Sequence, residues 1–353
     1  MLTFARMKKI GSFILIYFGF YLQISNAQEP HLKNLKQLTF GGDNAEAYFS
    51  PNGKYVSFQS NNKKWGLECD QIFKMNIAKA SKDSNYMPIK ISNGEGRTTC
   101  SYSMPNGKDV LYASTYLGSK ACPEVIHLKG KYVWSVYPDF DIFVANSNGK
   151  ILKQLTNSKG YDAEATISPK GDKIVFTSTR SGDLELWTMN IDGTNQQQIT
   201  HELGYDGGAF FSPDGTKLVY RASRPKTDVE KKEYMDFLSK GLVAPTDMEI
   251  YTCNVDGTNV QQITHLGKAN WAPFFNHAGN KIIFSSNHQS TKGYDFQLWM
   301  INMDGTGLEQ ITTESVFNAF PMFSPDGKKL IFSSNRNNHN TRDTNLFIAD
   351  WVD

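Results

Sequence analysis

The chain has 353 residues, of which 39% are hydrophobic, 13% aromatic and 20% charged. This composition provides ample apolar material for a large core and excludes a disordered chain or a coiled coil. With 37 basic and 35 acidic residues the formal net charge is +2, so no overall basic field favours nucleic acid as a partner.

The first 27 residues have the pattern of a secretory signal peptide. Three basic residues, Arg6, Lys8 and Lys9, precede an apolar run over 10–24, and the small residues of 25–27 follow it. The run is shorter than the roughly 20 apolar residues that span a bilayer, although a membrane anchor is the alternative. We therefore predict a signal peptide over 1–27, cleaved after Ala27, and a periplasmic or secreted mature protein without a membrane span.

The remainder of the chain repeats one pattern six times. A turn signature of the form Ser-Pro-x-Gly, degenerate in two copies, occurs at 50–53, 104–107, 168–171, 212–215, 276–279 and 324–327. A second signature, Gln-Ile/Leu-Thr or a close variant, ends at Thr39, Ser92, Thr156, Thr200, Thr264 and Thr312. The second position of the next turn follows 12 residues later once and 13 residues later five times. Such constant spacing indicates six copies of one structural unit.

Each copy contains the signals of four short strands. Alternating apolar runs follow the turns, as at 173–176, and Asp-Gly hairpin signals stand at 192–193, 256–257 and 304–305. We therefore predict an all-β fold, a six-bladed β-propeller of four-stranded antiparallel blades, as a single domain over 28–353. The repeats cover approximately 40–92, 93–156, 157–200, 201–264, 265–312 and 313–353.

The two ends of the pattern complement each other. The last copy ends after its third strand at Asp353, whereas 32–39 resembles a fourth strand with no blade before it. We expect this N-terminal strand to complete the C-terminal blade and close the ring, because the blade would otherwise expose an unpaired edge. Two domains divided near residue 200 are the alternative, but no linker interrupts the repeats there.

The repeat resembles that of a known family. The run Phe-Ser-Pro-Asp-Gly-Thr-Lys-Leu-Val-Tyr at 211–220, its copy at 323–332, and the tails at 176–180 and 332–336 are similar to the WD40-like (PD40) repeat of TolB proteins. The resemblance implies a periplasmic six-bladed propeller that binds envelope proteins, such as a peptidoglycan-associated lipoprotein. It covers the propeller part only, because about ten residues separate Ala27 from the first repeat and leave no room for the α/β domain of TolB. We expect a monomer.

Polar residues recur at one end of the predicted inner strands. Seven positions before each turn position stand Asn44, Thr98, Asp162, Asp206, Asn270 and Asn318, and two positions later stand Glu46, Cys100, Glu164, Gly208, Ala272 and Phe320. This end of a blade opens around the central channel. Four carboxylates, those of Glu46, Asp162, Glu164 and Asp206, are therefore candidate ligands of Ca²⁺. The alternative is that the first set caps the inner strands by bonding to the backbone.

Further candidate contact residues lie on the same face. Arg180, Arg224 and Arg336 form a column at the end of the second strand, where they suit a partner's carboxylate or pair with the carboxylates above and tie blades together. Trp271 is the aromatic residue that we expect to contact a ligand, with core packing as the alternative.

Two insertions also belong to this face. One, over 117–139, is rich in aromatic residues. The other, over 225–248, contains Thr227 and Glu230 in the spacing of a capping box and predicts a short amphipathic helix. Either the insertions pack on the ring or they form part of a partner site.

The four cysteines divide into two groups. Cys253 is predicted to be a core residue, whereas Cys69, Cys100 and Cys122 fall on loops or strand ends of the insertion-bearing face. A disulfide among these three suits an oxidising compartment. Free thiols, or a zinc site with Cys122 and His127, are the alternatives.

These observations favour a non-enzymatic module that binds a protein, or a glycan, through the insertion-bearing face and needs no cofactor. The sequence lacks the Gly-x-Ser-x-Gly elbow of a serine hydrolase. The alternative function is a Ca²⁺-dependent hydrolase of the six-bladed lactonase type, in which Asn270 and Asn318 would join the carboxylates as ligands.

Overall fold

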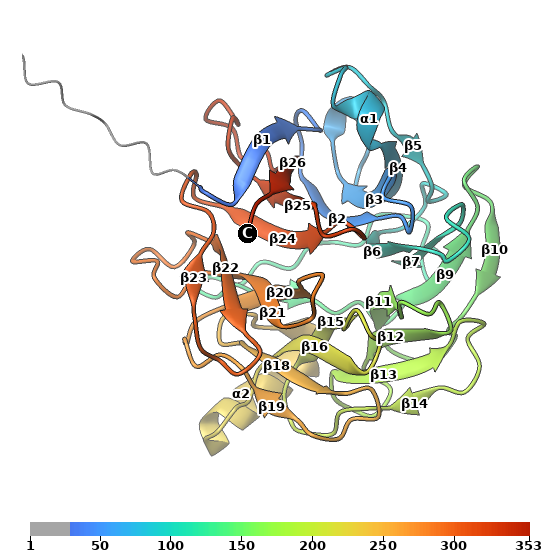
Figure 1. Ribbon diagram of the computed structural model, residues 1–353. Helices are drawn as coiled ribbons and strands as arrows, with labels where there is room; N and C mark the ends of the chain where they lie inside the picture. The colour runs from blue at the N-terminus through green and yellow to red at the C-terminus, as the bar shows by residue number, and fades with distance from the viewer. Residues whose placement is uncertain (1–28) are drawn as a thin grey trace, which may run out of the picture.

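The computed structural model describes residues 29–353, so the predicted signal peptide lies outside the described residues. Within this range the chain forms six four-stranded antiparallel sheets arranged around a central axis (Figure 1). The fold is the six-bladed β-propeller that the repeat spacing predicts.

The first three blades follow one another along the chain. Blade 1 consists of β2 (Asn44–Phe49), β3 (Tyr55–Ser60), β4 (Gln71–Asn76) and β5 (Ile89–Lys90); blade 2 of β6 (Thr98–Ser103), β7 (Val110–Ser114), β9 (Asp141–Ala145) and β10 (Ile151–Gln154); and blade 3 of β11 (Asp162–Ile167), β12 (Lys173–Ser178), β13 (Glu185–Asn190) and β14 (Gln197–Gln198).

The other three blades complete the ring. Blade 4 consists of β15 (Asp206–Phe211), β16 (Lys217–Ala222), β18 (Glu249–Asn254) and β19 (Gln261–Gln262); blade 5 of β20 (Asn270–Phe275), β21 (Lys281–Ser286), β22 (Gln297–Asn302) and β23 (Glu309–Gln310); and blade 6 of β24 (Asn318–Phe323), β25 (Lys329–Ser334), β26 (Asn345–Trp351) and β1 (Leu32–Gln37). The first strand of each blade lies innermost, and each inner strand contacts those of both neighbouring blades.

The N-terminal strand closes the ring, as predicted. β1 pairs antiparallel with β26, placing Leu32 opposite Trp351 and Gln37 opposite Phe347. Leu32 is buried in the apolar cluster of the last blades. Blade 6 therefore has a fourth strand, which protects an edge that would otherwise be open to other chains.

The two sequence signatures have separate structural purposes. In the turn at 212–215, the Gly215 N–H donates to the Ser212 carbonyl (2.8 Å) and the Ser212 hydroxyl accepts from the Lys217 N–H (2.9 Å). Gly215 has φ 74°, in the left-handed region that favours glycine. The Ser-Pro-x-Gly sequence thus closes the turn between the inner and second strands.

The second signature ends in Thr or Ser, and the hydroxyl of this residue forms a hydrogen bond with the backbone of the third strand of the blade. In all six blades the hydroxyl accepts a hydrogen bond of 2.8–2.9 Å from a third-strand backbone N–H; the residues are Thr39, Ser92, Thr156, Thr200, Thr264 and Thr312. Thr39 makes this bond to Leu346, across the closure of the ring. A buried backbone donor is satisfied in each case.

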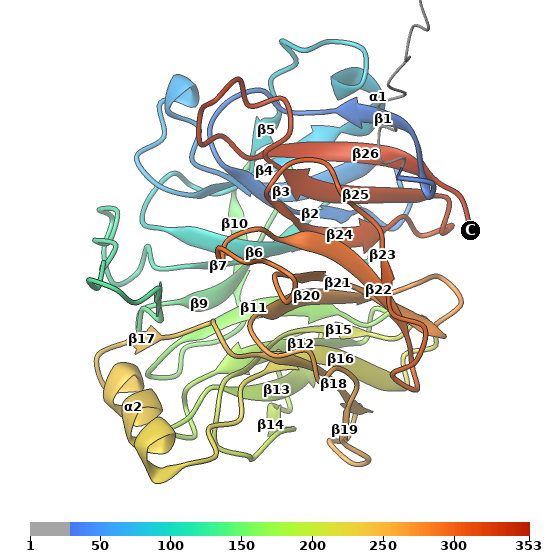
Figure 2. The same cartoon turned by 90° about the vertical axis from the view of Figure 1, so that its left-hand side faces the viewer.

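The two insertions fold together on one face of the ring. β8 (Trp134–Ser135) pairs antiparallel with β17 (Leu242–Val243), and α2 (Asp228–Leu238) precedes β17. Thr227 and Glu230 form the predicted capping box of α2. Figure 2 shows α2 and β17 projecting from the same side of the propeller. The described chain has two further short helices, η1 (Lys63–Trp65) and α1 (Ile77–Ala80), and over 29–353 no helix is long and apolar enough to span a bilayer.

Candidate functional site

All six inner strands carry a bulge near the insertion-bearing face. The pairing register with the second strand shifts there, and the bulged residue has a positive φ: 55° at Glu46, 49° at Cys100, 58° at Glu164, 60° at Gly208, 48° at Ala272 and 55° at Phe320. A bulge re-aims its side chain. Here all six residues line one cavity at the mouth of the channel. They are the residues that the sequence places two positions after the polar column.

The asparagines of the polar column bond to backbone groups near the ends of the inner strands. Asn44 and Asn270 are fully buried. The Asn44 amide donates to the carbonyls of Gly41 (3.0 Å) and Thr344 (3.1 Å), and the Asn270 amide donates to those of Met248 (2.8 Å) and Gly267 (3.1 Å). The Asn318 amide likewise donates to the Glu314 carbonyl (2.9 Å). These side chains satisfy backbone groups at the strand ends and do not line the cavity.

The arginine column pairs with the polar column of the same blade. Arg180 contacts Asp162 at 2.7 Å, and Arg224 contacts Asp206 at 2.5 Å. The reason is the register, because β12 ends beside the start of β11, where Asp162 lies opposite Ser178. Arg180 and Arg224 thus pair with two of the candidate carboxylates, as the structural alternative expects, but each pair lies within one blade and does not join neighbouring blades.

Arg336 differs from the other two arginines. It donates to the Asn318 side-chain carbonyl (2.9 Å) and forms an ion pair with Glu29 (3.0 Å). Both Arg336 and Glu29 are nearly buried. The pair therefore attaches the segment before β1 to blade 6.

The candidate Ca²⁺ ligands do not gather around one point. Asp162 and Asp206 are occupied by the arginines of their own blades, and Glu164 is occupied by Arg221. Across the described part of the chain, no three His, Cys, Asp or Glu residues form a group that could hold a metal ion. Of the four carboxylates, Glu46 alone has no arginine partner among residues 29–353.

Glu164 forms the ion pair that joins blades 3 and 4. One carboxylate oxygen accepts from Arg221 (2.5 Å) and Tyr205 (2.6 Å), and the other accepts from the Thr177 hydroxyl and the Gly208 N–H, each at 2.8 Å. Burial raises the pKa of Glu164, but the Arg221 charge and the hydrogen bonds from Tyr205 and Thr177 outweigh it and lower the pKa below its ordinary value. Glu164 is therefore a fixed carboxylate without free acceptor sites.

Gly208 makes this ion pair possible. A Cβ atom at residue 208 would lie 1.9 Å from Nη1 of Arg221. Blade 4 thus lacks a side chain at its bulge, and the arginine that reaches across to blade 3 takes the place of that side chain.

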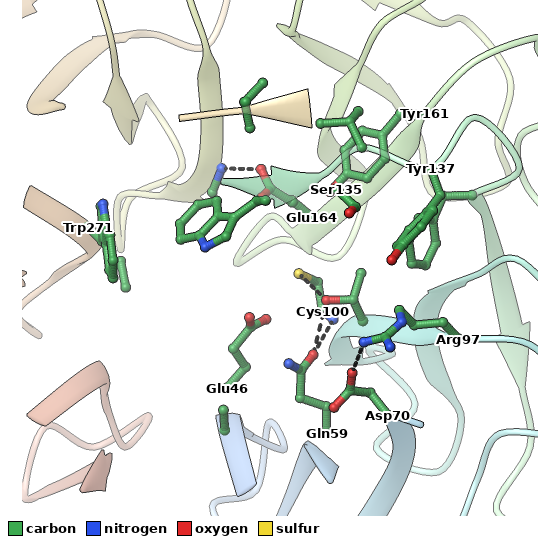
Figure 3. A pocket seen from close by; sticks show the side chains of 18 of the residues that line it. Glu46, Gln59, Asp70, Arg97, Cys100, Ser135, Tyr137, Tyr161, Glu164 and Trp271 are labelled. Carbon is green, nitrogen blue, oxygen red and sulfur yellow. Dashed lines mark hydrogen bonds and ion pairs between the residues drawn. The ribbon is translucent and has the colours of Figure 1, made fainter. Parts of the chain in front are cut away.

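The cavity has a volume of about 660 Å³, within the 300–1,000 Å³ typical of ligand pockets. Its wall combines the bulged residues with the insertion over 117–139, from which Tyr132, Trp134, Ser135 and Tyr137 contribute. Figure 3 shows the polar groups of the lower wall facing aromatic rings across an open space. The insertions are therefore part of the wall, which supports their role in a site.

Glu46 projects into this space. Figure 3 shows its carboxylate between Trp271 and Cys100, with no dashed line to either. Oε2 is buried and has no hydrogen-bond partner within the described residues. Burial raises the pKa of Glu46 to about 7; the Cys100 thiol lowers it and the Glu164 carboxylate raises it.

Trp271 both packs and lines the cavity. Its ring stacks on Phe296 at 4.2 Å between centroids and lies 5.0 Å from that of Trp134. Its indole N–H donates to the Pro245 carbonyl (2.8 Å) in the second insertion. Trp271 therefore holds the insertion in place and presents one side to the cavity.

The cysteines occupy three separate environments. Cys253 is fully buried in β18, as expected for a core residue. Cys100 lines the cavity, where burial raises the pKa of its thiol well above the ordinary value. Cys69 and Cys122 lie near each other, because Arg97 donates to the Cys122 thiol (3.7 Å) and pairs with Asp70, which follows Cys69. Burial and the Cys122 thiol raise the pKa of Cys69 to about 12. All four are free thiols in this structure.

Several cavity residues lie outside the two sets of polar and bulged residues that recur along the inner strands. Arg221 lies in β16 of blade 4, and Tyr205 directly precedes β15 of the same blade. Asp70 and Arg97 form a 2.5 Å ion pair at the cavity wall. The sequence offered one signal for Arg221: the consecutive glycines 207–208, where other blades have side chains.

Comparison with known proteins supports the fold. The family model described as the TolB beta propeller domain matches residues 131–241. A "putative TolB" from Agrobacterium tumefaciens has a similar structure, with a TM-score of 0.57 and 18% identity over 90% of this chain and 97% of that chain. TolB from Acinetobacter baumannii has a TM-score of 0.55 and 16% identity over 88% of this chain and 63% of that chain.

A third solved structure, an oligogalacturonate lyase in complex with manganese, has a TM-score of 0.49 and 14% identity over 90% of this chain and 93% of that chain. No functionally curated protein matches the chain in sequence. The family-model match and the two TolB structures confirm the predicted resemblance to TolB-like repeat propellers, limited to the propeller part.

Proposed function

Because the chain is a TolB-like repeat propeller, we propose that it is a periplasmic or secreted, non-enzymatic binding module of the cell envelope. Its partner inserts a segment into the cavity at the channel mouth, on the insertion-bearing face. The observation that carries this proposal is the cavity itself, about 660 Å³ in volume and walled jointly by the ring and the insertion over 117–139.

The surface around the cavity supports a protein partner. Leu117, Val125, Ile126 and Tyr132 of the insertion are 55%, 45%, 40% and 58% exposed. Large apolar side chains grouped at one rim are typical of interaction sites. Val125, Ile126 and Tyr132 also line the cavity, so the exposed rim and the cavity form one continuous surface.

A Ca²⁺-dependent hydrolase has less support. Three of the four candidate carboxylates already bind arginines, and a Ca²⁺ site needs several oxygen atoms about 2.3–2.6 Å from one point. The thiol of Cys100 is a poor nucleophile, because burial and the neighbouring carboxylates hold its pKa well above the ordinary value.

Site-specific photocrosslinking in envelope extracts tests the binding face. We expect benzoylphenylalanine at Tyr132, on the rim, to crosslink a partner. The same residue at Lys170, in an exposed turn at the opposite end of β11, is the matched control and should give no product. Equal crosslinking from both positions would contradict the proposed face. Absence of any product from Tyr132 would exclude a stable protein partner there.

A further inference from the structure

The cavity has an excess of negative charge. Its lining includes four carboxylates, those of Asp43, Glu46, Asp70 and Glu164, and the cationic side chains of Arg97, Lys131 and Arg221. Arg97 pairs with Asp70, Arg221 with Glu164, and Lys131 with Glu233 of α2. Each arginine and the lysine therefore has a carboxylate already. Two lining carboxylates, Asp43 and Glu46, have no ion-pair partner among the residues that the structure describes.

Glu46 is the deeper of the two. Asp43 is exposed at the rim, whereas Oε2 of Glu46 is buried and has no hydrogen bond. Leaving a buried acceptor unsatisfied destabilises the folded protein, and more so when the group is charged. A cation placed against this oxygen would offset that cost, by charge alone for a quaternary ammonium group and with an added hydrogen bond for a primary one.

Aromatic rings surround the same space. Tyr48, Tyr161, Trp271 and Phe320 line the cavity, as does Trp134, over whose ring the Arg221 guanidinium already lies at 5.3 Å. The faces of such rings are negative and attract cations. A sugar would also stack on aromatic rings, but its hydroxyls would not balance the unpaired carboxylates.

We propose that the cavity binds an organic ammonium group, held against Glu46 and surrounded by the aromatic residues of the wall. This inference rests on the proposed function, because it names the chemistry of the group that enters the cavity. A small amine and the lysine side chain of a protein partner both supply that chemistry.

Calorimetric titration of residues 28–353 with matched probes at pH 8, above the raised pKa of Glu46, tests the proposal. Choline carries a trimethylammonium group, and 3,3-dimethyl-1-butanol has the same shape without the charge. We expect choline to bind about tenfold more tightly, which corresponds to about 1.4 kcal/mol. Equal affinities for the charged and the neutral probe, both in this pair and in the pair of lysine and norleucine derivatives, would overturn the proposal.

A pair of variants tests whether Glu46 supplies the negative charge that holds the ammonium group. Glu46→Gln keeps the shape of the side chain and removes its charge, and it should weaken choline binding about tenfold. Glu124→Gln removes an exposed carboxylate from the insertion over 117–139 and should leave binding within about twofold, because exposed charges are screened. Thermal unfolding verifies that both variants fold. Undiminished binding by Glu46→Gln would overturn the proposal.

A second arm distinguishes the two sources of the ammonium group. Nα-acetyl-lysine methylamide represents a partner's side chain, and its norleucine analogue is the neutral control. Tighter binding of the lysine derivative than of choline indicates a protein ligand, and the reverse indicates a small quaternary amine. Crosslinking from Tyr132 without any ammonium binding would reject this inference and leave the proposed function standing. Ammonium binding without a crosslinked partner would support this inference and reject the proposed function.

Discussion

Glu46 and Glu164 occupy the same position in blades 1 and 3, with φ values of 55° and 58°, yet their pKa values are shifted in opposite directions. Arg221 reaches Glu164 from blade 4 and lowers its pKa, whereas the pKa of Glu46 is raised by burial to about 7. Blade 2 places the neutral thiol of Cys100 next to Glu46, and that thiol does not compensate for burial. The neighbouring blade, and not the repeat itself, determines the chemistry of each bulged residue.

The raised pKa of Glu46 predicts a pH-dependent effect of Glu46→Gln on stability. At pH values between the ordinary pKa of 4.5 and the folded value of about 7, Glu46 is protonated in a larger fraction of folded molecules than of unfolded molecules. Rising pH therefore destabilises the wild type through this group, whereas the glutamine of the variant cannot ionise. We expect the stability of the variant relative to wild type to increase by about 3 kcal/mol between pH 4.5 and pH 8.

Urea unfolding at several pH values measures this difference. Other carboxyl groups with raised pKa, such as Glu185 and Asp206, are present in both proteins and cancel. A difference that does not change with pH would show that Glu46 titrates near its ordinary value.

The proximity of Cys69 and Cys122 predicts a specific disulfide in the oxidised protein. It would attach the insertion over 117–139 to blade 1 and stabilise the fold by about 4 kcal/mol, as expected from closing a loop of this length. Peptide mapping under non-reducing conditions should recover the 69–122 crosslink, with Cys100 and Cys253 alkylated as free thiols. A crosslink that contains Cys100 would contradict the arrangement seen here.

At the scale of the element, the inner strand is the unit that builds the site. Each of these strands has its polar cap at one end, a left-handed bulge two residues later and the Ser-Pro-x-Gly turn at the other end. The recurrence of a positive φ in all six blades means that the conformation belongs to the blade. The side chain at the bulge is then free to vary, and it is this variation that makes the cavity wall acidic on one side and apolar on the other.

Gly208→Ala tests the coupling between bulges. The backbone conformation accepts alanine, since Ala272 adopts it in blade 5 with φ 48°. The new Cβ would instead displace Arg221 and disturb its ion pair with Glu164. Disrupting a buried ion pair costs about 3–5 kcal/mol, so we expect a loss of about 3 kcal/mol in chemical denaturation.

The matched control is Ala272→Gly, which alters the equivalent bulge where no arginine crosses. It should change stability by less than about 1 kcal/mol. Equal effects of the two substitutions would mean that the ion pair does not depend on Gly208.

At the scale of the whole molecule, stability depends on the closure of blade 6 by β1. His31 stacks on Trp351 at 4.9 Å, and Arg336 binds Glu29, so the two ends of the described chain are held side by side. Figure 1 shows β1 at the edge of β26. The outer edge of β26 has no other strand beside it in the described part of the chain.

Removing residues 29–37 should therefore destabilise the ring and promote association through β26. Leu32 alone contributes about 2 kcal/mol by burial, and the lost ladder bonds add about 1 kcal/mol each, so we expect a total loss of about 5 kcal/mol. Thermal unfolding and light scattering measure the two effects.

A circular permutant provides the control. It begins at Leu38 and carries residues 29–37 after Asp353 through a short linker, which converts β26 and β1 into a hairpin. Because the pairing is antiparallel and Leu32 lies opposite Trp351, the linker spans a short distance. We expect stability close to that of the original chain; a permutant as unstable as the truncated protein would argue against closure as the cause.

The sequence by itself determined the ring. Two short signatures, separated by 12 or 13 residues, recur along the chain and predict the number of blades, the four strands of each blade and the closing strand. The prediction succeeds because each signature forms a backbone hydrogen bond within its blade, and the same bond recurs from blade to blade. The helix over Asp228–Leu238 follows from a capping box for the same reason. Short sequence patterns therefore predict the hydrogen bonds that form within one blade or at one helix end.

The tertiary structure alone decided the chemistry of the mouth. Asp162 and Glu164 stand two residues apart, but one binds Arg180 within its blade and the other binds Arg221 from the next blade. The unpaired carboxylate of Glu46, the room left by Gly208 and the joining of two insertions through β8 and β17 all depend on segments far apart in sequence. Charge pairing and burial are set by neighbours in space, so the repeat pattern located the bulged residues and the fold determined which of them remains free to bind a ligand.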